Sequence, residues 1–140
     1  MKKRPKILLV DDDIGAMAYF VEALEREGYD VVQEWSVSGA LDFLRAYSQT
    51  IDGAILDVML PVGSFECKAP DEEALCGGLA VFRYLQSHHP GIPILILTNI
   101  SSGSLLEHFP ETESIRVMNK CDCLPSEAAS IVRSLVGANP

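Results

Sequence analysis

Five short apolar runs, separated by segments with helical spacing, limit the folds that this 140-residue chain can adopt. The runs are "KILLV", "VVQEW", "GAILD", "PILILT" and "IRVMN", which begin at residues 6, 31, 53, 93 and 115. Their length and their content of leucine and β-branched residues predict strands. Apolar residues three or four positions apart predict helices over residues 17–28, 40–47, 79–86 and 128–135, and a short one over 101–109. Gly28 is expected to close the first helix, and Ser126 to cap the last.

Strict alternation of strands and helices predicts an α/β fold with a parallel sheet and helices on both faces, because consecutive parallel strands need a crossover connection. The unbroken apolar character of residues 7–10, 54–56 and 94–97 agrees with strands buried on both faces. Trp35, which ends the second run, is expected to be a packing residue. In sheets of this kind, ligands bind beyond the carboxyl ends of the strands, so the residues found there are the first candidates for chemistry.

Polar residues gather at the predicted strand ends: Asp11, Asp12 and Asp13 after the first strand, Asp57 on the third, Thr98 on the fourth and Lys120 after the fifth. A helix N-cap explains one of the three consecutive aspartates, most naturally Asp13, and a solvated turn explains another. Neither explains Asp57, because a further carboxylate buried beside these costs stability. A divalent cation removes the conflict. Mg²⁺ suits the site because it prefers oxygen ligands and is commonly held by one or two carboxylates.

A lysine and a threonine that face the same point complete a set of groups suited to phosphoryl transfer. A metal ion and an ammonium neutralise the phosphoryl oxygens, a hydroxyl adds a hydrogen bond, and a carboxylate serves as the nucleophile. Taken alone, Thr98 is an ordinary β-branched strand residue and Lys120 a surface charge. Their combination with Asp57 favours the chemical interpretation.

Four segments occur in one order along the chain: "ILLVDDD" at 7–13, "AILDVMLP" at 54–61, "ILILTN" at 94–99 and "VMNK" at 117–120. With these segments, the chain resembles a response-regulator receiver domain of two-component signalling over nearly its whole length. The resemblance implies a flavodoxin-like, doubly wound fold of five βα units, with a five-stranded parallel sheet of order 2-1-3-4-5. It also implies a single receiver domain over residues 1–140, with residues 62–78 inserted between the third strand and the third helix.

By this resemblance, Asp57 is the phosphoacceptor and receives a phosphoryl group from a phosphohistidine of a sensor histidine kinase or phosphotransfer protein. Lys120 then pairs with the phosphoryl group, and Thr98 moves inward in response to it. Phosphorylation is expected to switch a face that binds an unidentified target protein. This face comprises the fourth helical segment, the fifth strand and the last helix, and a homodimer through it is left open.

The resemblance also implies the ligands of a Mg²⁺ ion. Asp11 and Asp12 match the acidic pair of the family, with Asp12 the direct ligand, and Asp57 and the backbone carbonyl of Met59 complete the set. Asp13 falls outside the pair, in agreement with its interpretation as a cap.

Several positions depart from the family pattern. The insertion at 62–78 is interpreted either as a tolerated surface loop or as a lid or docking element, with a short helix from Asp71. Cys121 replaces a proline, Val117 stands where a switch aromatic often sits, and Asn99 replaces a small residue. Their effects on switching stay open.

Two apolar residues, Met59 and Ile100, occupy positions that flank the phosphoryl group in the family. Because neither side chain can orient an attacking water, we expect slow self-dephosphorylation. The chain is otherwise expected to be a phosphoacceptor and not an enzyme.

Composition and charge restrict localisation and partners. No apolar run approaches the roughly 20 residues of a membrane span, and the first residues do not form a signal peptide, which favours the cytoplasm. The net charge of −9 argues against direct DNA binding and favours a basic partner or a cation. Four cysteines, Cys67, Cys76, Cys121 and Cys123, are too few and too clustered for a disulfide framework, and reduced thiols are favoured over zinc or redox pairing.

Two other functions compete with phosphorylation. The main alternative is a pseudo-receiver that is not phosphorylated and acts as a protein-interaction module, with its site covered by residues 62–78 or altered by Asn99 and Cys121. A phosphatase of the haloacid dehalogenase type is disfavoured, because Asp57 has no role in that mechanism and too few acidic residues follow Lys120.

Overall fold

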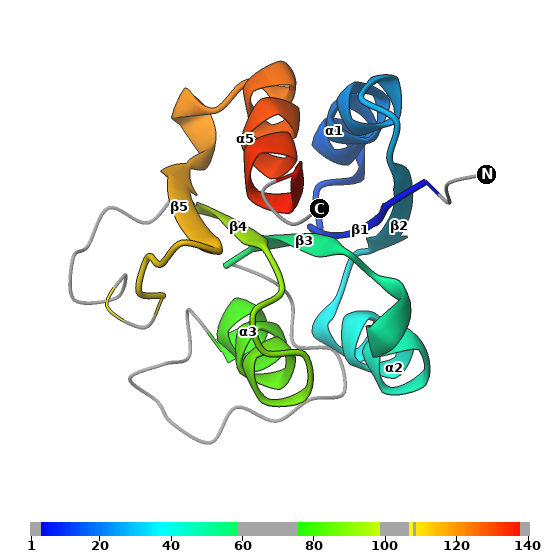
Figure 1. The fold of residues 1–140 in the computed structure, drawn as a ribbon, viewed down its shortest axis with the longest axis vertical. Helices are drawn as coiled ribbons and strands as arrows, with labels where there is room; N and C mark the ends of the chain where they lie inside the picture. Colours follow the sequence, from blue (N-terminus) through cyan, green and yellow to red (C-terminus); the bar gives the residue numbers. More distant parts are fainter. Residues whose placement is uncertain (1–3, 59–75, 99–106, 108, 138–140) are drawn as a thin grey trace.

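The computed structural model describes residues 4–58, 76–98, 107 and 109–137. Five strands form one parallel sheet of order β2-β1-β3-β4-β5, as Figure 1 shows, and this order confirms the predicted topology. The strands are β1 (Lys6–Val10), β2 (Asp30–Glu34), β3 (Gly53–Asp57), β4 (Ile94–Thr98) and β5 (Ile115–Asn119). Three have the predicted bounds, β4 begins one residue later than predicted, and β2 is shifted by one residue toward the N-terminus at both ends.

Four α-helices and two short 3₁₀ helices lie in the described part of the chain. They are α1 (Ile14–Arg26), α2 (Val37–Tyr47), α3 (Cys76–His88) and α5 (Pro125–Gly137), with η1 (Ser48–Thr50) and η3 (Lys120–Asp122). Each α-helix contains most of a predicted helix and begins earlier than predicted. The predicted helix at 101–109 and the one from Asp71 lie almost wholly outside the described residues.

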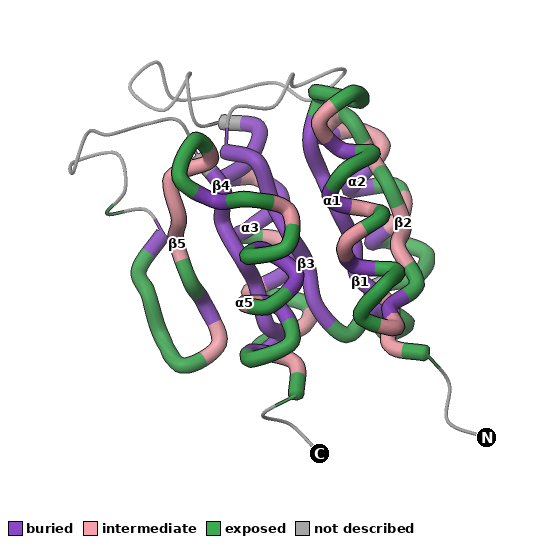
Figure 2. Tube along the Cα trace, turned by 90° about the horizontal axis from the view of Figure 1, so that it is seen from above, coloured by how far each residue is buried: buried purple, intermediate pink, exposed green. Residues whose placement is uncertain are grey.

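The helices cover the sheet in two layers. Figure 1 shows α1 and α5 on one face and α2 and α3 on the other. Alternate residues of the central strands serve the two layers: Ile7 and Leu9 belong to the cluster under α1 and α5, whereas Leu8 and Val10 belong to the cluster under α2 and α3. Burial on both faces explains the continuous apolar runs, and Figure 2 shows the buried central strands.

Both ends of α1 follow predicted capping chemistry. The N-cap is Asp13, whose Oδ1 accepts the N–H of Ala16 at 3.0 Å, which confirms this assignment. At the other end, Gly28 has a φ of +94°, a value that glycine adopts without strain, and its N–H donates to the carbonyl of Glu25 at 3.0 Å. The direction of α1 away from the end of β1 is therefore set by local sequence.

Two local predictions were wrong. Ser126 does not precede the last helix but lies in its first turn, because α5 begins at Pro125. Proline is favoured at a first helical position, where its missing N–H is not needed.

Trp35 does not pack into the core. The second strand ends at Glu34, and Trp35 lies in the turn to α2 with 59% of its surface exposed.

The predicted insertion is shorter than expected at its carboxyl end. Residues 62–75 lie outside the described part of the chain, but Cys76, Gly77 and Gly78 form the first turn of α3 and are not a loop. The resemblance to the family predicted that the insertion ends at Gly78. Two consecutive glycines also disfavour a helix by intrinsic propensity. A tertiary contact overrides this propensity, since the N–H of Gly78 donates to the carbonyl of Val58 at 3.1 Å.

None of the helices in the described segments is long and apolar enough to cross a membrane.

Candidate functional site

Two acidic residues lie at adjacent strand ends. Asp11 directly follows β1, and Asp57 is the last residue of β3. Because Val10 pairs with Leu56 in the parallel register, the two aspartates are neighbours at the carboxyl edge of the sheet. Their side chains are only 4% and 8% exposed. Within the described residues they are the only buried ones of polar or charged type, so this edge of the sheet holds an unusual concentration of buried charge.

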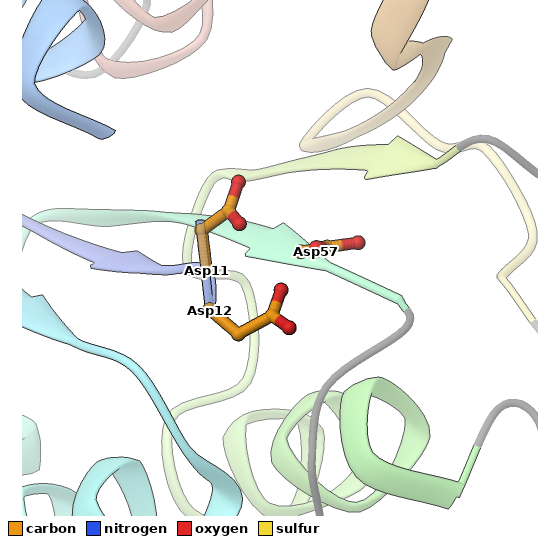
Figure 3. Close-up of side chains that lie close together, drawn as sticks. All are labelled: Asp11, Asp12 and Asp57. Carbon is orange, nitrogen blue, oxygen red and sulfur yellow. The ribbon is translucent and has the colours of Figure 1, made fainter. Parts of the chain in front are cut away.

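Asp12 brings a third carboxylate to the same point. One carboxylate oxygen from each of Asp11, Asp12 and Asp57 lies within 4.8 Å of the other two. Figure 3 shows the three side chains at the ends of β1 and β3, with the carboxylate of Asp12 turned toward Asp57. Asp12 is exposed, so the cluster opens to solvent on its side.

Three contacts fix Asp11. Its Oδ1 accepts the N–H of Asp13 at 2.9 Å, and its Oδ2 lies 2.7 Å from the Nζ of Lys120. Its own N–H donates to the carbonyl of Glu34 at the end of β2, at 3.1 Å. The carboxylate of Asp11 is therefore held by the start of the next helix and by the lysine, while its backbone continues the sheet.

Lys120 balances part of this charge. Its Nζ contacts Asp11 at 2.7 Å and the Oδ2 of Asp57 at 3.4 Å, and its side chain is 15% exposed. Burial by itself lowers the pKa of Lys120, but the hydrogen bond to Asp11 and the charge of Asp57 outweigh burial and raise the pKa above its usual value. The lysine is therefore a permanent cation at neutral pH.

Asn119 orients Lys120, a role that the sequence reasoning missed. The lysine opens the 3₁₀ helix η3, and the side-chain oxygen of Asn119 accepts the N–H of Cys121 at 2.9 Å. This contact shapes the turn in which Lys120 leaves β5. The preference of asparagine for caps, read on the pair "NK" at the end of a strand, is a signal that could have found it.

The charges of the cluster fit a divalent cation. Three carboxylates and one ammonium leave a net charge of two negative, concentrated where two of the acids are buried. Closely spaced carboxylate oxygens with one exposed flank are the hard donor set that Mg²⁺ takes, usually together with waters. The residues present therefore fit Mg²⁺, which Asp11, Asp12 and Asp57 would hold.

Two further predicted site residues are described in part or not at all. Thr98 ends β4, where its backbone pairs with Asn119 beside the lysine, but its side chain lies outside what the structure describes. Met59, the expected carbonyl ligand, also lies outside the described residues, as do Asn99 and Ile100.

Cys121 and Cys123 form no disulfide bond within the described residues. Cys121 is exposed and Cys123 is buried, whereas Cys67 and the side chain of Cys76 lie outside the described part of the chain. Burial, followed by the charge of Glu127, raises the pKa of the Cys123 thiol. Val117 lies half-buried on β5, against the cluster under α2 and α3.

Comparison with known proteins decides the family. Residues 7–121 match the model of the response regulator receiver domain. The chain belongs to this family. This receiver domain is thus the signalling module of a response regulator in a two-component system, and its fold agrees with that assignment.

The receiver domain is also similar to a curated protein. It is 35% identical over 96 residues to TcrX, a probable transcriptional regulatory protein of Mycobacterium tuberculosis, and this match covers 68% of the chain but only 35% of TcrX. The chain therefore spans about a third of the curated relative that it matches.

Solved receiver structures share the fold at low identity. A response regulator receiver protein from Sinorhizobium medicae matches with a TM-score of 0.74 and 20% identity, over 99% of this chain and 98% of that chain. The receiver domain of a Francisella response regulator matches with a TM-score of 0.72 and 18% identity, over 97% of this chain and 99% of that one.

Proposed function

We propose that this receiver domain accepts a phosphoryl group on Asp57 in a Mg²⁺-dependent reaction and thereby switches a protein-binding surface. The observation that carries this proposal is the position of Asp57. Its buried carboxylate ends a central strand, within 4.8 Å of the oxygens of two further acids and 3.4 Å from a lysine ammonium.

The proposed step is a displacement at phosphorus. A carboxylate oxygen of Asp57 forms a bond to the phosphorus of a phosphohistidine, and the bond from phosphorus to the imidazole nitrogen breaks. The electron pair of that bond stays on the nitrogen, which takes up a proton from solvent. The product is an acyl phosphate on Asp57 and a free histidine on the donor.

The neighbouring groups lower the barrier by placing charge in advance. Lys120 lies next to Asp57 and would move from the carboxylates to the incoming phosphoryl oxygens, which it neutralises. Asp11, Asp12 and Asp57 would hold a Mg²⁺ ion, which would supply further positive charge beside those oxygens. The hydroxyl of Thr98 and the carbonyl of Met59 are proposed to complete the site, on the strength of their sequence positions.

Slow loss of the phosphoryl group is also a proposal. It rests on the apolar character of Met59 and Ile100, which flank the site by resemblance to the family.

The rim of the site supports a protein as the phosphoryl donor. Ile14 and Leu124, which follow the ends of β1 and β5 within a few residues, are 65% and 63% exposed, and Trp35 follows the end of β2. An open groove between α1 and the start of α5 continues this surface and includes Tyr19 and Leu124. Apolar side chains around a charged site favour docking of a protein that delivers the phosphoryl group.

The cellular setting and the partners of the domain are also proposals. This protein is proposed to be cytoplasmic, with a sensor histidine kinase or phosphotransfer protein as its phosphoryl donor. The net charge of −9 favours a protein over DNA as the downstream partner. Residues 1–140 are proposed to form a single receiver domain. Pairing of two copies through the face of the fourth helical segment, β5 and α5 stays open.

The test is phosphorylation by a small donor. Incubation of the protein with acetyl phosphate and Mg²⁺, followed by intact-mass measurement, is expected to show the addition of one phosphoryl group. The Asp57→Asn variant and a sample with the metal chelated are expected to show none. If the wild-type protein gains no mass under conditions in which it is folded, it is an interaction module and not a phosphoacceptor.

A further inference from the structure

Helix α3 approaches the backbone beside Asp57 more closely than any side chain allows. A Cβ atom added to Gly78 would lie 2.5 Å from the Cα of Val58, 2.6 Å from its carbonyl oxygen and 2.9 Å from the carbonyl oxygen of Asp57. Real Cβ atoms essentially never come within 3.0 Å of such atoms. All three neighbours are backbone atoms, which no rotamer change moves, so only glycine fits at this position.

The close approach creates a backbone clamp on the residue after the proposed phosphoacceptor. The N–H of Val58 donates to the carbonyl of Leu97 on β4 at 3.3 Å, and its carbonyl accepts the N–H of Gly78 at 3.1 Å. Gly78 is the third residue of α3, where N–H groups have no partner within the helix. An N–H group of α3 that has no partner within the helix therefore bonds to the carbonyl of Val58, the residue after Asp57. On the other side, the N–H of Val58 bonds to β4.

We infer that Gly78 is a positioning residue for the Mg²⁺ and phosphoryl site, acting through the backbone of Asp57 and Val58. This inference rests on the proposed function and extends it to a residue that touches neither ligand. A side chain at position 78 would push α3 away or shift the end of β3. Either change moves the carboxylate of Asp57 relative to the carboxylates of Asp11 and Asp12. Because a bound metal needs its ligand oxygens within a few tenths of an ångström, the shift weakens binding.

The alternative is that Gly78 serves packing alone, in which case its replacement lowers stability without changing the site of the folded protein. Two controls separate these cases. Gly53 opens the same strand at the end away from Asp57. The atoms nearest to an added Cβ there belong to the side chains of Val136 and Ile7, at 3.1 and 3.2 Å, and to the carbonyl of Pro93, at 3.4 Å. Leu85 is fully buried on the same helix, two turns from Gly78, and its replacement by alanine removes packing without touching the site.

The experiment measures metal affinity directly. Binding of Mn²⁺, displaced by Mg²⁺, is followed by electron paramagnetic resonance at a temperature where urea titration shows each variant to be folded. Gly78→Ala is expected to weaken binding about ten-fold or more, the range seen when groups that orient metal ligands are removed. Gly53→Ala and Leu85→Ala are expected to keep the wild-type affinity within about two-fold, although Leu85→Ala lowers the urea midpoint of unfolding. Wild-type affinity in folded Gly78→Ala would overturn the inference.

A second measurement uses the wild-type protein and remains decisive if Gly78→Ala does not fold. In protein labelled with ¹⁵N-glycine, the amide resonance of Gly78 is expected to shift during Mg²⁺ titration with the same midpoint as metal binding. The amide of Gly28, at the far end of α1, is expected to stay in place. If Mg²⁺ binds but the Gly78 resonance does not move, the clamp is not coupled to the site and the inference fails. If the wild-type protein binds no Mg²⁺ at all, the proposed function itself fails.

Discussion

Among single residues, Lys120 decides whether the acidic cluster is tolerated without a metal. Its ammonium is mostly buried and contacts one carboxylate at 2.7 Å and a second at 3.4 Å. Leaving buried carboxylates without a cation is far more expensive than the modest gain from a surface ion pair. The free energy of unfolding should therefore depend strongly on this one side chain.

Replacement of Lys120 by methionine is expected to lower the free energy of unfolding at neutral pH by about 3 kcal/mol, because it breaks a buried charge cluster. The raised pKa gives the sign of the pH dependence. The contribution of Lys120 is present below the ordinary lysine pKa of 10.5 and is lost as the pH rises through the higher pKa of the folded state. Urea titrations of both proteins across this pH range provide the measurement. A difference that stays constant well above pH 10.5 would contradict the assignment.

The consecutive aspartates are expected to separate into two roles. Asp13→Ala removes the cap of α1 and is expected to cost about 1 kcal/mol of stability while leaving Mg²⁺ affinity unchanged. Asp12→Asn removes one of three clustered charges, so it is expected to raise stability in the absence of metal and to abolish Mg²⁺ binding. Urea titration and calorimetric Mg²⁺ titration of both variants test this. Loss of Mg²⁺ binding in Asp13→Ala would show that the cap is also a ligand.

Among the secondary-structure elements, the connections that follow the strands carry both the charged groups and the apolar rim. The turn after β1 supplies the acids and Ile14, and the turn after β5 supplies Lys120 and then Leu124. These two connections therefore supply charged side chains to the site and, within a few residues, an exposed apolar side chain. Because the two sets of residues are separate, substitutions at the exposed apolar positions can alter binding of a donor protein while the charged groups that react with the phosphoryl group stay the same.

Leu124→Ser is expected to separate docking from chemistry. Phosphorylation by acetyl phosphate should keep its wild-type rate, because Leu124 is 63% exposed and is not one of the proposed reacting groups. Transfer from a phosphorylated histidine kinase that is active toward the wild-type protein should slow about ten-fold, the effect of losing roughly 1.4 kcal/mol of contact energy. Rates from both donors, measured on one preparation, provide the comparison. Equal slowing with both donors would instead indicate damage to the site.

Local sequence predicts these elements correctly where a single structural preference, such as hydrophobic pattern or helix capping, decides the outcome. Short apolar runs identified every strand in the described part of the chain, and Asp13 was recognised as a cap because it directly precedes a helical segment. Gly78 was assigned to the insertion from the resemblance to the family. Helix propensity disfavours glycine, and the contact with Val58 that overrides this preference lies outside any sequence window. Trp35 was expected to pack because apolar character alone does not show where a strand ends.

For the whole molecule, the site exists only when the fold does. Its residues come from the ends of β1 and β3 and from the turn after β5, and the ion pair between Asp57 and Lys120 joins positions 63 residues apart. The parallel register places these ends on one edge, which is why the strand order predicts the convergence of Asp11, Asp57 and Lys120. The finer arrangement is set by packing and has no sequence signal. For example, the sequence does not indicate that Lys120 lies closer to Asp11, at 2.7 Å, than to Asp57, at 3.4 Å.

Coupling of the site to the fold predicts that Mg²⁺ stabilises the protein. A ligand that binds only the folded state adds about 2.7 kcal/mol at a concentration one hundred times its dissociation constant. Urea titration with and without Mg²⁺ is expected to show this gain in the wild-type protein and a much smaller one in Asp12→Asn. Equal gains in both proteins would mean that the ion acts elsewhere.

The position of the phosphoryl group is the most direct measurement of the proposed function. After reaction with acetyl phosphate and Mg²⁺, borohydride reduces an aspartyl phosphate to homoserine, which peptide mass spectrometry locates in the chain. Homoserine at position 57 and at no other aspartate is the expected result. Homoserine at Asp11 or Asp12, or at no position in a protein that is folded and binds Mg²⁺, would contradict the assignment of Asp57 as the phosphoacceptor.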